Sequence, residues 1–168
     1  MPEQYFEDFE PGQIFRGSTR FRLDGQAITD FAARYDPQPF HLDDEAAKGT
    51  IFGGLAASGW HTAAITMRLL VDSDLKVAGG LVGAGMEELR WPRPVRPGDE
   101  LRIEAEVLSV RESKSRPHQG IIRVRNTTLN QNDEPVQICV SAMIVPRRSA
   151  SAAQPAAVES GTEAETLN

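Results

Sequence analysis

An acid and a base lie five residues apart in a short stretch that contains two prolines. The stretch runs from Tyr35 to His41 and reads Tyr-Asp-Pro-Gln-Pro-Phe-His. Each proline lacks an N–H donor and disfavours helical backbone in the residue before it, so we expect a segment that is not regular helix. Such a segment allows Asp36 and His41 to converge, whereas side chains five positions apart on a helix point in different directions. An ordinary Asp-Pro turn is the alternative interpretation.

The position of Asp36 favours a chemical role. The preceding residues, 26–35, show the spacing of a short helix. Its predicted apolar face consists of Ile28, Phe31, Ala32 and Tyr35. Asp36 would follow the last turn, where the helix dipole disfavours negative charge. An acid placed against its local field is more often functional than stabilising.

A second helix signal covers residues 54–71. Ser58 is a plausible N-cap and Gly59 opens the first turn. The amide of Gly59 would be unpaired at this position, and both it and the dipole favour developing negative charge on a carbonyl oxygen. The alternative is a helix start with no further role. The predicted buried stripe of this helix is Trp60, Ala63, Ala64, Met67, Leu70 and Val71.

These three groups match the needs of one reaction class. Adding water to an activated alkene, or removing it, requires a base, an acid and a group that stabilises an enolate. Asp36 and His41 could share the first two tasks by holding one water molecule. Gly59 could provide the third through its backbone N–H.

Hydrophobic periodicity predicts an α+β domain, with helices in the front half and strands in the rear half. Residues 43–47 indicate a short helix with an acidic start. Alternating patterns over 101–108, 122–124 and 136–144 indicate antiparallel strands, and 81–91 should form another. We expect the folded domain to cover residues 1–146. The low-complexity segment 147–168 has almost no bulky apolar side chains, so we expect it to be disordered.

Composition excludes several function classes. The chain has 168 residues, 40% of them hydrophobic, and a net charge of −6, which argues against nucleic acid or an anionic membrane as the main partner. No apolar run approaches the roughly 20 residues that span a bilayer, and the first residues do not read as a secretory signal. The single cysteine, Cys139, fits a cytoplasmic location and is interpreted as a small hydrophobic strand residue. Three scattered histidines predict no metal site.

The motifs above resemble those of the MaoC-like, (R)-specific enoyl-CoA hydratases, which have the hot-dog fold. The family motif Asp-x-Asn-Pro-Leu-His is followed about eighteen residues later by a glycine that opens the central helix. The resemblance implies a long central helix wrapped by a curved antiparallel sheet. It also implies that Asp36 and His41 activate water and that Gly59 donates to the thioester oxygen. Gln38 stands in place of the family's asparagine, so its amide would act at a different distance.

The resemblance further implies an acyl-CoA substrate, a homodimer and no cofactor other than the coenzyme A of the substrate. Candidate substrate contacts are Ser58, Phe40, Trp60 and Arg93. Arg90 and Arg96 lie near Arg93 in sequence, and the three could meet the coenzyme A phosphates or simply be surface arginines. Two alternatives remain open, an acyl-CoA thioesterase of the same fold and a non-catalytic acyl-CoA-binding module.

Overall fold

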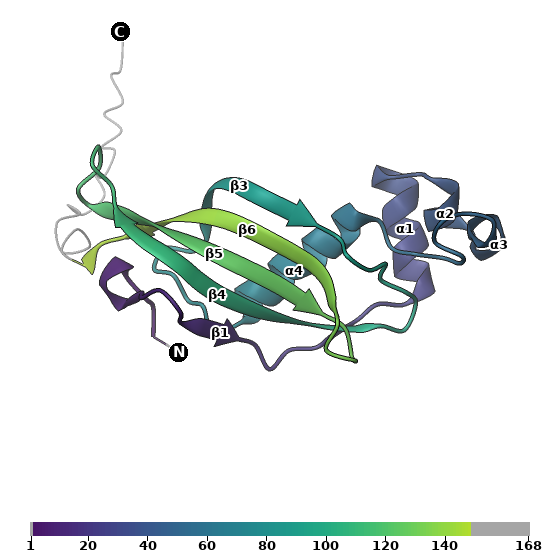
Figure 1. Ribbon diagram of the computed structural model, residues 1–168, viewed down its shortest axis with the longest axis horizontal. Helices are drawn as coiled ribbons and strands as arrows, with labels where there is room; N and C mark the ends of the chain where they lie inside the picture. Colours follow the sequence, from purple (N-terminus) through teal and green to yellow (C-terminus); the bar gives the residue numbers. More distant parts are fainter. Residues whose placement is uncertain (1, 149–168) are drawn as a thin grey trace, which may run out of the picture.

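A computed structural model describes residues 2–148, in which one antiparallel sheet curves along a long helix (Figure 1). Five strands of the sheet follow one another in the order β1-β4-β5-β6-β3, and β2 pairs with β4. Their bounds are β1 Ile14–Arg16, β2 Phe21–Arg22, β3 Val82–Arg90, β4 Glu100–Glu112, β5 Gln119–Leu129 and β6 Pro135–Pro146. The predicted strand regions are therefore confirmed.

The helices lie in the front half of the chain, as predicted. They are a 3₁₀ turn η1 Phe6–Asp8 and the α-helices α1 Gly25–Tyr35, α2 Pro39–Leu42, α3 Asp44–Lys48 and α4 Gly59–Asp72. Helix α4 lies along the sheet, and α1, α2 and α3 gather at one end of it (Figure 1). This is the predicted α+β hot-dog arrangement. Within the described residues no helix is both long and apolar enough to cross a bilayer.

The core lies between α4 and the facing side of the sheet. On β4 the side chains of Leu101, Ile103, Ala105 and Val107 are all buried, as their period of two predicts. They pack with Ile65 and Leu69 of α4. A register shift between Val107 and Ser109 in the β4–β5 pair is consistent with the curvature of the sheet, since bulges bend strands.

The predicted buried stripe of α4 was wrong at most of its positions, although Leu70 is buried as predicted and Ala63 is half-buried. Trp60, Met67 and Val71 are exposed, and Ala64 is exposed as well. Besides Leu70, the buried face carries His61, Thr62, Ile65, Thr66 and Leu69. Threonine hydroxyls tolerate burial here because they are paired: Thr62 donates to the Ser58 carbonyl at 3.3 Å, and Thr66 lies 2.6 Å from the Thr128 hydroxyl.

Two smaller expectations also need correction. Residues 39–42 form one helical turn, α2, because Pro39 occupies its first position, where a missing N–H costs nothing. Tyr35 was placed on the buried face of α1, but its side chain is 69% exposed, since α1 buries only Ile28 and Ala32 fully.

Two residues beyond the boundary predicted at residue 146 contact the N-terminal turn. Arg147 pairs with Glu7 at 3.1 Å and Arg148 contacts Asp8 at 2.6 Å, so both residues bind the N-terminal turn. The predicted disorder of the tail concerns residues 149–168, which lie outside the described part.

His61 makes the stability of the fold depend on pH. Its ring stacks on Phe31 with centroids 4.4 Å apart, its Nδ1 atom is buried with no hydrogen-bond partner among residues 2–148, and burial lowers its pKa. The unfolded chain therefore binds a proton near the ordinary histidine value of about 6.5, where the folded chain does not. The stabilising contribution is complete above that pH and is lost as the pH falls below it.

We predict that His61→Phe weakens the loss of stability at acid pH, because phenylalanine keeps the stack and cannot be protonated. Urea unfolding of both proteins at pH 7.5 and 5.5 measures this. The wild type should lose more unfolding free energy between the two pH values than the variant. Equal losses would show that His61 does not titrate on unfolding.

Candidate active site

The structure brings Asp36 and His41 together at the junction of α1 and α2. Asp36 caps the C-terminus of α1, and its Oδ2 atom lies 3.5 Å from Nε2 of His41. The His41 side chain is 7% exposed and that of Asp36 is 22% exposed. The pair is therefore largely desolvated, with the carboxylate still reachable from outside.

Hydrogen bonds hold both members of the pair. Nδ1 of His41 lies 2.7 Å from the carbonyl oxygen of Ala56. A carbonyl only accepts, so Nδ1 carries a proton and the neutral ring has a bare lone pair on Nε2. On the other side, Ser58 donates its hydroxyl to Oδ2 of Asp36 at 2.6 Å.

In this tautomer the two facing atoms are both acceptors. Carboxylate oxygen and bare imidazole nitrogen cannot bond to each other without a proton between them. A water molecule can donate one hydrogen to each, or a single proton can lie between them. The geometry is therefore suited to holding and deprotonating water.

The N-terminus of α4 is linked to the same pair through Ser58. The Ser58 hydroxyl accepts from the amide of Trp60 at 3.2 Å while donating to Asp36. No hydrogen bond within residues 2–148 is donated by the amide of the intervening Gly59. An unpaired helix N-terminal amide beside an acid–base pair is a suitable donor to a substrate oxygen.

Gly59 is required by its neighbour Trp91. A Cβ at residue 59 would lie 2.7 Å from the Trp91 ring, which is closer than carbon atoms approach. Trp91 is fixed in turn by its indole N–H, which donates to Gln137 at 2.8 Å, and by edge-to-face contact with Trp60. Sequence reasoning did not identify Trp91, because nothing in its local pattern reports a contact with residue 59.

The other predicted site residues differ in their positions. Phe40 packs edge-on against His41 with centroids 4.6 Å apart. The side chain of Gln38 is exposed, and its backbone carbonyl accepts from the His41 amide at 2.9 Å. Trp60 is 60% exposed. Arg93 lies on the surface beside Glu134 at 3.4 Å.

Arg96 binds the backbone of the loop that precedes Ala56. Its guanidinium donates to the carbonyls of Gly54 at 2.7 Å and Leu55 at 3.1 Å, and also to that of Phe52. These residues directly precede Ala56, whose carbonyl orients His41. The arginine therefore fixes the loop that sets the histidine tautomer, with its donors committed to the protein.

Three further residues with titratable side chains have other surroundings. His118 is exposed, and Glu87 pairs with Arg123, whose guanidinium lowers the pKa of that carboxyl. Burial raises the pKa of the Cys139 thiol, which fits its interpretation as a hydrophobic strand residue. The described residues contain no group of three or more potential ligands placed to hold a metal ion.

We predict that Arg96→Lys makes the Nδ1–H tautomer of His41 less exclusive, because an ammonium cannot reproduce the bonds that the planar guanidinium makes to three carbonyls. Nitrogen-15 NMR of the neutral ring should show the Nδ1–H form in the wild type and a mixture in the variant, with about 1–3 kcal/mol less stability. Arg123→Lys, at a surface ion pair, serves as the control. An unchanged tautomer in Arg96→Lys would contradict the assignment.

Comparison with known proteins identifies the family. The family model of the MaoC like domain matches residues 8–130. A crystal structure of the MaoC-like dehydratase from Rhodospirillum rubrum is 54% identical, covers 86% of this chain and 98% of its own, and superimposes with a TM-score of 0.83. The (R)-hydratase PhaJ1 of Pseudomonas aeruginosa is 26% identical, with 86% of each chain covered and a TM-score of 0.67. The uncharacterized protein YdeM of Bacillus subtilis strain 168 is 32% identical over 76% of this chain and 88% of its own. The chain therefore belongs to the MaoC-like dehydratase family and has its hot-dog fold.

Proposed function

We propose that this protein hydrates a trans-2-enoyl-CoA to an (R)-3-hydroxyacyl-CoA, or catalyses the reverse dehydration. The observation that carries the proposal is the pair of facing acceptors, Asp36 Oδ2 and His41 Nε2, 3.5 Å apart. Membership of the family and the likeness to an (R)-hydratase support it.

The proposed step is a syn addition of water. One member of the Asp36–His41 pair takes a proton from the bound water, and the oxygen forms a bond to C3 of the enoyl thioester. The electron pair of the alkene moves toward the thioester carbonyl, whose oxygen accepts from the amide of Gly59. The resulting enolate takes a proton at C2 from the pair, which restores the starting protonation state.

The surrounding residues fit defined parts of this reaction. Ser58 holds the Asp36 carboxylate through a 2.6 Å hydrogen bond, and Phe40 covers one side of His41. Trp60 is the second residue of α4 and follows Gly59, where the thioester would bind. Arg93 has an exposed guanidinium that could meet a coenzyme A phosphate. The activated thioester itself acidifies C2, so the step needs no metal or redox cofactor.

We further propose that the protein is a cytoplasmic homodimer. Strand β3 lies at an edge of the sheet, and its residues 82–87 are exposed in the single chain. Val82 and the neighbouring α4 residues Met67 and Val71 also leave apolar surface uncovered. An exposed, long edge strand with apolar neighbours favours pairing with a second copy.

We predict that Asp36→Asn lowers turnover by about 10²-fold or more, because the amide cannot accept the proton. Loss of the enoyl-thioester ultraviolet absorbance measures hydration, and a thiol reagent measures any hydrolysis in the same sample. Asp74→Asn, at an exposed position, is the matched control. Thiol release that depends on Asp36 would indicate a thioesterase, and equal behaviour of all three proteins would indicate a non-catalytic binding module.

The dimer has its own test. Sedimentation equilibrium of the wild type should give twice the mass of the chain. Val82→Glu places a charge on the exposed edge strand and should shift the mass toward that of one chain. A wild-type mass of a single chain would exclude the proposed dimer.

A further inference from the structure

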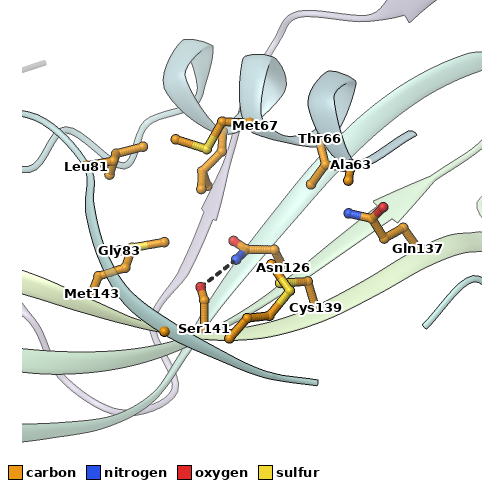
Figure 2. Close-up of a pocket in the computed structure, with 13 residues that line it drawn as sticks. Ala63, Thr66, Met67, Leu81, Gly83, Asn126, Gln137, Cys139, Ser141 and Met143 are labelled. Carbon is orange, nitrogen blue, oxygen red and sulfur yellow. Dashed lines mark hydrogen bonds between the residues drawn. The ribbon is translucent and has the colours of Figure 1, made fainter. Parts of the chain in front are cut away.

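A cavity of about 420 Å³ lies between α4 and the sheet (Figure 2). Most of its wall is apolar or small, and it is lined from four elements. Helix α4 contributes Ala63 and Met67, β3 contributes Gly83, β5 contributes Asn126, and β6 contributes Cys139 and Ser141. The glycine and alanine leave room where larger side chains would fill the space.

One end of the cavity adjoins the candidate active site. Ala63 follows Gly59 by one helical turn, and Gln137, which also lines the cavity, accepts from the Trp91 indole that packs on Gly59. A thioester carbonyl bound at the Gly59 amide would therefore direct its acyl chain into this space. This step rests on the proposed function.

Asn126 lies deeper in the cavity. It pairs in register with Cys139, which lies two residues along β6 from Gln137. Asn126 is therefore about 7 Å farther than Gln137 from the end of the cavity that adjoins the candidate active site. The residue is 3% exposed, and its Oδ1 atom is buried with no hydrogen-bond partner in the described part of the chain. Figure 2 shows the amide nitrogen facing Ser141, at a long distance of 3.4 Å, with the oxygen on the side of α4.

An unpaired buried amide atom costs about 1–3 kcal/mol. If the amide of Asn126 is turned over, the oxygen accepts from Ser141 and an N–H becomes the unpaired group. A ligand hydroxyl satisfies either orientation, because it both donates and accepts. An unsubstituted alkyl chain satisfies neither.

The charge of the residues that line the cavity further restricts the chemical class of the ligand. None of the residues that line the cavity is charged. A carboxylate or ammonium on the acyl chain would be buried without a counter-ion, which costs far more than an unpaired amide. The chemistry therefore favours a neutral hydroxyl.

We propose that the cavity selects an acyl chain that carries a hydroxyl group, which hydrogen-bonds to Asn126. A bound water molecule is the competing occupant of this position. The two differ in their consequences, since a retained water would leave no preference for the hydroxylated chain.

The test compares matched enoyl-CoA pairs of several lengths, in which a terminal hydroxyl replaces a terminal methyl group. In the wild type we expect the hydroxylated member to have a kcat/KM about tenfold higher at one chain length. Asn126→Leu removes the hydrogen-bonding group at similar volume and should reverse the order at that length. Asn126→Val, with a strong strand former, provides a second variant if the first folds poorly.

The control is Thr127→Val, which removes a hydroxyl from the opposite face of β5 and should keep the wild-type ratio. Equilibrium binding of the corresponding saturated acyl-CoA pairs should give the same order. If the methyl member is hydrated and bound as well or better at every length, the inference is overturned while the proposed hydratase function stands. If no member is hydrated, the proposed function fails.

Discussion

The hydrogen bond from Nδ1 of His41 to the Ala56 carbonyl determines what the acid–base pair can do. It fixes the proton on Nδ1 and leaves the Nε2 lone pair facing the Asp36 carboxylate. With the opposite tautomer, Nε2–H would donate directly to Asp36 and close the pair to water. Much of the local structure serves this one bond. The Ala56 amide donates back to the Phe40 carbonyl at 3.2 Å, and Arg96 holds the loop that precedes Ala56.

The convergence of Asp36 and His41 was accessible from the sequence because it depends on local spacing. The two prolines and the five-residue interval predicted it, and the start of α4 at Gly59 was predicted from its N-cap residue. The strands were equally accessible, since β4 alternates buried and exposed side chains with a period of two. Both signals are short in range and arise directly from backbone geometry.

What the sequence did not reveal depends on contacts between distant residues. The buried face of α4 was assigned by hydrophobicity, but Thr66 is buried because its hydroxyl meets Thr128, 62 residues away. Trp60 and Met67 are apolar yet exposed in the single chain. Arg96 resembled a phosphate ligand because its partners are backbone carbonyls, which have no signature in the sequence.

The polar face of α4 also accounts for the space beside it. Besides Ile65 and Leu69, α4 meets the sheet with threonines that pair with helix carbonyls and with β5, and these short side chains need no large apolar partner. The small residues Ala63 and Gly83 extend the gap between α4 and the sheet as far as the edge strand β3. A helix packed by a fully apolar stripe would fill the gap with its own side chains. The buried threonines that weaken the amphipathic pattern of α4 therefore also leave a cavity open next to its N-terminus.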